Sequence, residues 1–220
     1  MNIYMQYGDN SKKLSYEKWD FGFVGKCVDD RGSEAKNFLE KNTITTIEIE
    51  YNPQEYILNI SGVDYLVDSV DEYFIQTLNS DSKVVLDCTT MGIAEMLILI
   101  QVLYDLKLKN IDVIYLEPEC YKNNKTKTHS KRDFELSKGF EGYIGIPGHT
   151  LSISTDNKDK IAFFCGFESE RIERAFEDLS LNGDKSQLFF GVPAFHSGWE
   201  MNSFSNNIRV IDDRNINRNF

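Results

Sequence analysis

The chain has 220 residues, enough for one sizeable α/β domain or two smaller ones. Its 41% hydrophobic and 13% aromatic content is typical of a packed globular protein and excludes a disordered one. The formal charge of −11 argues against duplex nucleic acid as a partner, because phosphate binding depends on an excess of lysine and arginine. A small anion held locally by arginines and backbone amides is still compatible with this charge.

The cysteine pattern predicts neither a disulfide framework nor a zinc site. Cys27, Cys88, Cys120 and Cys165 show no CxxC spacing and no histidines nearby. There is also no leader-like segment, and acidic and amide residues interrupt the longest apolar run. We therefore expect a cytoplasmic protein with reduced cysteines, no membrane partner and no bound metal. The sequence does not indicate which cofactor, if any, the protein binds.

The N-terminal third predicts a strand, a helix and a second strand. They cover Phe21–Val24, Ser33–Lys41 and Ile44–Tyr51. A hairpin follows over residues 55–68, and its turn is formed by Ser61 and Gly62.

The next segment, residues 69–80, predicts a helix that leads into the middle of the chain. Ser69 is its expected N-cap, and Glu72 follows at the spacing of a capping box.

The middle of the chain gives the clearest strand–helix–strand pattern. It predicts a strand at Val84–Cys88, a helix from Met91 to Lys107 and a strand at Ile111–Leu116. Continuously apolar strands of this kind are typical of parallel sheets covered on both faces. The helix is apolar nearly all round, so we expect it to lie between the sheet and another element.

The C-terminal half begins with the polar, lysine-rich stretch Pro118–Gly139, which is either a functional loop or a plain solvated excursion. A second strand–helix–strand pattern then covers Ile161–Cys165, Glu168–Asp178 and Ser186–Val192. Together these patterns predict a single α/β domain over 1–220, Rossmann-like and three-layered, with a mostly parallel central sheet and one inserted hairpin. The segment 196–220 either packs on this domain or continues beyond the chain.

Ligands of open parallel sheets bind beyond the carboxyl ends of the strands, where the strand order reverses. The turn after the middle strand is therefore a candidate anion site. Thr89, Thr90 and Gly92 offer two hydroxyls and a glycine at a helix N-terminus, which suits a phosphate or carboxylate. The alternative is a simple helix cap, and neither GxGxxG nor a P-loop motif is present.

A glycine also begins the turn after the strand Ile161–Cys165. Gly166 permits a tight turn there, and Arg171 either reaches back toward an anion or pairs with Glu168 at i,i+3.

Aromatic residues follow the last predicted strand. Phe195 and Trp199 could stack on a base or sugar, form a lid or bind a partner chain.

An enzyme is the alternative to a binding domain. It would act on a nucleotide or glycosidic bond through Glu168 or Asp87, with His196 as acid–base. Glu117 and Glu119 would join this acidic group if their strands are neighbours.

The middle segment resembles an element of the CRISPR-associated Rossmann-fold (CARF) sensor domains, a strand followed by a threonine-rich turn and a helix. The residues that carry the resemblance are Asp87, Thr89, Thr90 and Gly92. In that family this turn and a glycine-led turn hold a cyclic oligoadenylate across a dimer, and Gly166–Glu168 would be the counterpart of the second turn. The resemblance implies a sensor role in antiviral defence.

Our leading hypothesis is a non-catalytic domain that binds a small anionic or nucleotide-like ligand at the strand ends. We expect it to act as a homo-oligomer or with a partner protein. A third possibility is an interaction subunit with no small ligand.

Overall fold

The computed structural model describes residues 18–117, 143, 145–149, 160–191 and 198–216. Contacts divide the chain into two compact units, Met1–Pro118 with Ile144–Thr150 and Glu119–Tyr143 with Leu151–Phe220. The sequence predicted one domain over 1–220, whereas each of these units has its own sheet.

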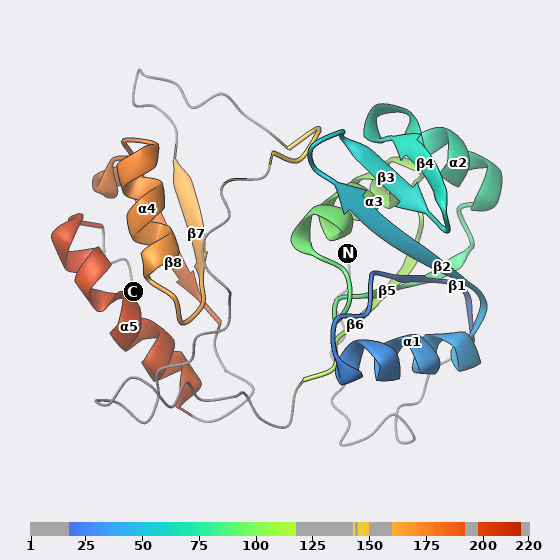
Figure 1. Ribbon diagram of the computed structural model, residues 1–220, viewed down its shortest axis with the longest axis horizontal. Coiled ribbons are helices and arrows are strands. Elements are labelled where there is room, and N and C mark those ends of the chain that lie inside the picture. Colours follow the sequence, from blue (N-terminus) through green and yellow to red (C-terminus); the bar gives the residue numbers. More distant parts are fainter. Residues whose placement is uncertain (1–17, 118–142, 144, 150–159, 192–197, 217–220) are drawn as a thin grey trace. The chain divides into compact units, whose positions relative to one another are not determined.

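The first unit contains a mixed, mostly parallel sheet of six strands in the order β4-β3-β2-β1-β5-β6 (Figure 1). β1 pairs in parallel with β2 and β5, and β5 pairs in parallel with β6, whereas β2, β3 and β4 are antiparallel. The strands are β1 (Trp19–Val24), β2 (Thr43–Asn52), β3 (Ile57–Ile60), β4 (Val63–Leu66), β5 (Lys83–Asp87) and β6 (Asn110–Ile114).

The inserted hairpin is confirmed as β3–β4. Ser61 and Gly62 form its turn with φ angles of 49° and 88°, the positive values that a tight two-residue hairpin turn requires.

Helices cover both faces of this sheet. α1 (Asp30–Asn42) lies on one side, and α2 (Val70–Thr77) and α3 (Ile93–Asp105) lie on the other (Figure 1). Leu39 and Val85 belong to the core under α1, and Leu86 and Leu99 belong to the larger core under α2 and α3. The α/β class is therefore confirmed, and the antiparallel part of the sheet limits the likeness to a Rossmann fold.

Strand β2 shows which residues face which layer. Ile47, Ile49 and Tyr51 are buried in the core that α2 and α3 cover. Since side chains alternate along a strand, Glu48 and Glu50 point to the α1 face.

The start of α1 differs from the predicted one, and Ser69 precedes α2 as predicted but does not cap it with its side chain. Asp29, rather than a residue near Ser33, caps α1 by accepting a hydrogen bond from the Gly32 amide at 3.0 Å. Ser69 occupies the N-cap position of α2 after a short 3-10 turn (η2, Val67–Ser69), but its hydroxyl donates to the Leu66 carbonyl. The capping box predicted there is therefore not formed.

The second unit contains two parallel strands, β7 (Ile161–Cys165) and β8 (Ser186–Phe190). α4 (Glu170–Asp178) and a 3-10 turn (η3, Gly183–Lys185) connect them, and α5 (Trp199–Asp213) follows. The core of this unit combines residues of both helices with the inward side chains of both strands. The sequence prediction missed α5, because its asparagines and serines have low helix propensity.

No helix in the part of the chain that the structure describes is long and apolar enough to cross a membrane.

We predict that Gly183→Ala destabilises the second unit by about 1–3 kcal/mol, the usual cost of overpacking. A Cβ atom at residue 183 would overlap the Arg214 carbonyl, which is backbone and cannot move aside. Gly166→Ala is the matched control, since its Cβ would meet open space and its φ is not left-handed. Urea unfolding measures both, and equal stability of the two variants would contradict the packing described.

Candidate ligand site at the carboxyl end of β1

The strand order reverses at β1. The chain leaves β1 through α1 to reach β2 on one side, and it leaves β5 through α3 to reach β6 on the other. The carboxyl ends of β1 and β5 are therefore the switch point at which open α/β sheets bind ligands.

The turn after β5 uses its polar groups within the protein. The Asp87 carboxylate is fully buried and accepts hydrogen bonds from the Thr89 amide at 2.9 Å and the Thr90 hydroxyl at 2.6 Å. The Thr90 hydroxyl in turn accepts the Gly25 amide at 2.8 Å, and the Thr89 hydroxyl accepts the Leu116 amide at 2.9 Å. The two hydroxyls predicted to hold an anion therefore join the ends of β1, β5 and β6.

The end of β1 can approach the turn after β5 this closely because residue 25 is a glycine. A Cβ atom at this position would collide with the Thr90 carbonyl and lie 2.8 Å from the Met91 Cα. Gly92, the third residue of the predicted anion site, is the N-cap of α3.

Acidic side chains already occupy the N-terminal turns of α1 and α3. Asp29 caps α1, and the hydrogen bond from Arg31 to its carboxylate, at 2.7 Å, is the main reason why the pKa of Asp29 is lowered. Glu95 lies in the first turn of α3 and accepts the Tyr51 amide at 3.1 Å. Because the helix dipoles already face carboxylates of the protein, these two ends are poor places for an external anion.

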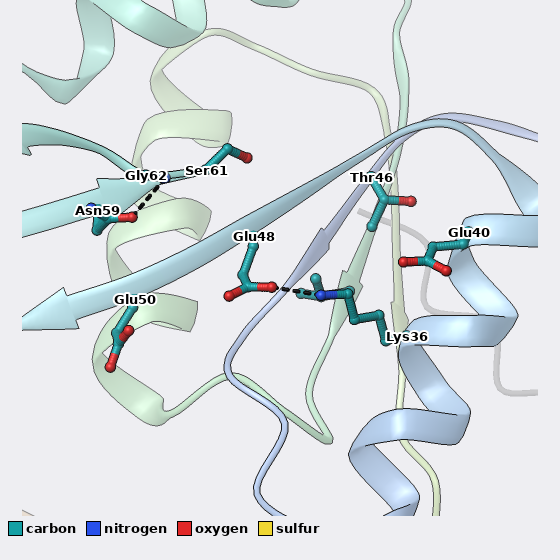
Figure 2. A pocket seen from close by; sticks show the side chains of 9 residues that line it. Lys36, Glu40, Thr46, Glu48, Glu50, Asn59, Ser61 and Gly62 are labelled. Carbon is teal, nitrogen blue, oxygen red and sulfur yellow. Dashed lines mark hydrogen bonds and ion pairs between the residues drawn. The ribbon is translucent and has the colours of Figure 1, made fainter.

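A hollow of about 380 Å³ lies beside the end of β1, between α1 and the outward face of β2 and β3 (Figure 2). Its volume is within the range of small-molecule sites. Its lining is polar apart from one valine at the end of β1, and it consists of Val24, Lys36, Glu40, Thr46, Glu48, Glu50, Asn59, Ser61 and Gly62.

The hollow carries more acidic than basic groups. Lys36 reaches from α1 to Glu48 at 2.6 Å (Figure 2), and this hydrogen bond is the main reason why the pKa of Lys36 is raised. Lys26, in the loop after β1, pairs with Glu50 at 3.1 Å. Within the described part of the chain, the Glu40 side chain makes neither an ion pair nor a hydrogen bond. The lining thus offers carboxylate, amide and hydroxyl oxygens to a ligand with hydrogen-bond donors.

The acids of the hollow do not form a metal centre. Among the residues described, no three His, Cys, Asp or Glu side chains are grouped so that they could hold a metal ion.

The predicted residues of the second unit are also engaged within the protein. Arg171 pairs with Glu168 at 3.1 Å, the i,i+3 alternative of the sequence analysis. The Gly166 carbonyl accepts hydrogen bonds from Ser203 at 2.7 Å and from Asn207 at 3.0 Å, both on α5. The turn at Gly166 is therefore held in place by the C-terminal helix.

The predicted stacking residues have different outcomes. Trp199 is the first residue of α5, and its ring meets that of Phe167 edge to face at 5.7 Å. Phe195, His196 and Glu119 lie outside the described residues.

At Glu117, just after β6, both carboxylate oxygens are buried without a hydrogen-bond partner in the described structure.

The residues of the hollow were not predicted from the sequence to form a site. The signal was present in β2, where Glu48 and Glu50 alternate with buried Ile47 and Ile49. Charged residues at every second position of a strand indicate a face that is open to solvent.

A scan against protein-family models, a search of curated proteins and a search of solved structures each found no match.

We predict that Thr90→Val lowers the free energy of unfolding by about 1–3 kcal/mol, because it leaves the buried Asp87 carboxylate and the Gly25 amide short of a partner. Thr45→Val makes the same chemical change at an exposed position of β2 and should alter stability by less than about 0.5 kcal/mol. Chemical denaturation followed by circular dichroism compares the two. A Thr90 variant as stable as the control would show that the junction does not depend on this hydroxyl.

Proposed function

We propose that the first unit is a Rossmann-like binding domain for a small, donor-rich molecule of nucleoside-like type. The ligand lies in the hollow at the carboxyl end of β1. The observation that carries this proposal is a polar hollow of about 380 Å³ beside the strand end where the order of the sheet reverses.

The charges of the hollow favour donor groups on the ligand. Three carboxylates, of Glu40, Glu48 and Glu50, line it together with one ammonium, that of Lys36. Hydroxyl groups of a ribose, or amino groups of a base or sugar, would donate to these oxygens. The lining of the hollow thus supports a nucleoside-like ligand. An anionic ligand has no support, because Thr89, Thr90 and the N-termini of α1 and α3 bind groups of the protein itself.

The bonding of the predicted catalytic acids favours binding over catalysis. Both oxygens of Asp87 are hydrogen-bonded inside the protein, and Glu168 is paired with Arg171. A catalytic carboxylate has to reach the reacting bond, and Asp87 is fully buried.

Three other expectations stay predictions. A sensor role and a part in antiviral defence depend on the resemblance to CARF domains, which the turn Asp87–Gly92 carries. A cytoplasmic location depends on the cysteine pattern of the sequence.

We predict that nucleosides or amino sugars raise the melting temperature of the full chain and that inorganic phosphate does not. A ligand at 100 times its Kd adds about 2.7 kcal/mol of stability, a shift of several degrees for a chain of this size. No shift with any donor-rich compound, or a shift with phosphate alone, would contradict the proposal.

The residues of the hollow are tested by a pair of substitutions on α1. Glu40→Gln should weaken binding about tenfold or more, since a hydrogen bond to a carboxylate contributes about 1.5–3 kcal/mol. Glu34→Gln removes the same charge from an exposed position that does not line the hollow, so its affinity should equal that of the unaltered chain. Isothermal titration calorimetry with the compound found above measures both, and equal affinities would place the ligand elsewhere.

A further inference from the structure

Strand β4 is an edge of the six-stranded sheet, because β3 is its only neighbour (Figure 1). In an antiparallel pair, opposite residues alternate between those that exchange backbone hydrogen bonds and those that do not. The Val67 amide, next to Leu66, donates to the Tyr56 carbonyl at 3.1 Å. The backbone groups of Leu66 and, two residues earlier, of Asp64 therefore point away from β3 to the open edge.

Outward backbone groups of β4 have no partner among the described residues. They are the N–H and C=O of Asp64 and the N–H of Leu66. The strand contains neither the proline nor the lysine with which proteins commonly block a sheet edge, and its register shows no bulge. Val63 and Leu66 are 54% and 59% exposed. The edge is therefore open to another extended segment, whose backbone has the complementary donors and acceptors.

A second hollow, of about 470 Å³, lies at the end of β4. We call it the β4 pocket. The turn between β2 and β3, the end of β4 and the loop 145–149 form its walls, and the Gly145 carbonyl ties this loop to β2 by accepting the Tyr51 hydroxyl at 3.2 Å. The lining residues are Glu55, Tyr56, Leu66, Val67, Asp68 and Pro147.

The β4 pocket combines apolar walls with two carboxylates, and its lining contains no basic residue. Glu55 accepts a hydrogen bond from the Asn52 side-chain amide at 3.0 Å, and the Asp68 carboxylate has no partner among the described residues. Both acids are exposed. Lysine and arginine match such a surface, because the apolar stem packs along apolar walls while the charged head stays in water beside an acid.

We propose that the edge of β4 and the β4 pocket bind an extended segment of a partner protein, which adds to the sheet as a further strand and places a lysine or arginine side chain in the pocket. In this mode of recognition the backbone hydrogen bonds provide affinity and a pocket for one side chain provides specificity. The formal charge of −11 favours a basic segment over an acidic one. The proposal does not depend on a ligand in the hollow beside β1.

The short length of β4 sets the strength of this interaction. The strand has four residues, so an added segment gains few backbone hydrogen bonds besides one exposed ion pair. We expect a Kd on the order of 100 µM. Added salt should weaken binding, because it screens the attraction between exposed charges.

Fluorescence anisotropy of labelled hexapeptides, titrated with the full chain, tests the proposal. The peptides alternate valine with threonine and carry arginine, lysine, glutamine or glutamate at one central position. The arginine and lysine peptides should bind about two- to fivefold more tightly than the glutamine peptide, the range expected for an exposed ion pair. The glutamate peptide should bind most weakly.

Two pairs of variants locate the binding site. Leu66→Pro removes the outward N–H and preserves the hairpin, because φ at Leu66 is −64°, the value that proline requires. It should weaken binding of the arginine peptide about tenfold or more, whereas Leu66→Ala shortens the same side chain, keeps the N–H and should stay within about threefold of the unaltered chain. Asp68→Asn should lower the affinity for the arginine peptide about two- to fivefold and leave that for the glutamine peptide unchanged. Asp71→Asn, at an exposed position on α2 outside the pocket, is its control and should change neither affinity.

The proposal is overturned if no peptide binds, if the arginine and glutamate peptides bind equally, or if the Asp68 and Asp71 variants behave alike. It is also overturned if Leu66→Pro, with a circular dichroism spectrum like that of Leu66→Ala, binds as tightly as that control. Sedimentation equilibrium without peptide distinguishes a second copy of this chain as the occupant. A dimer that is lost in Leu66→Pro and kept in Leu66→Ala would assign the edge to self-association and reject a separate basic partner.

Discussion

The hydrogen bonds around the buried carboxylate of Asp87 are the interaction on which the carboxyl edge of the first unit's sheet depends. A carboxylate inside a protein is costly unless its oxygens are hydrogen-bonded, so the chain has to supply donors at short range. The Thr89 amide and the Thr90 hydroxyl do so, and the same threonines accept amides from the ends of β1 and β6. The buried Asp87 carboxylate thereby holds together the carboxyl ends of β1, β5 and β6 and the turn that leads into α3.

This arrangement changes the chemistry that the edge offers. The Thr89 and Thr90 hydroxyls, which could bind an anion, make hydrogen bonds inside the protein. Acidic side chains of the chain itself lie at the N-termini of α1 and α3. The space that remains lies on the α1 side of β2, and its walls carry more negative than positive charge. The proposed site reaches the switch point of the sheet through Val24 at the end of β1, and the charge of its lining favours a ligand with donors.

Much of the fold was predictable from the sequence, because it depends on local patterns. Apolar runs located β1, β2, β5, β7 and β8, and the Ser61–Gly62 pair located the hairpin turn. Helix α5 was missed because tertiary contacts, including the hydrogen bonds of the buried Asn207, compensate for its poor intrinsic propensity. The division into two units was also not predictable, since a strand–helix–strand pattern does not say which sheet the strands join.

The residues that line the hollow were not predicted from the sequence as a site. The sequence directed attention to glycines and hydroxyls after strands, and the structure assigns Thr90 and Gly166 to internal hydrogen bonds. The lining of the hollow comes from α1, β2 and the hairpin, which only the pairing of β2 with β1 and β3 brings together. The alternating acids of β2 are visible in the sequence, but the sequence does not show that α1 and the hairpin lie beside them.

The most direct test of ligand binding in the hollow is a titration of the isotopically labelled chain with adenosine, followed by the backbone amide signals in two-dimensional NMR spectra. If the ligand lies in the hollow, the amides of Glu48, Asn59, Ser61 and Gly62 shift in a saturable manner, and those of Thr89, Thr90 and Gly92 stay in place. Saturable shifts confined to Thr89–Gly92, or no shift at any amide of the first unit, would contradict the account.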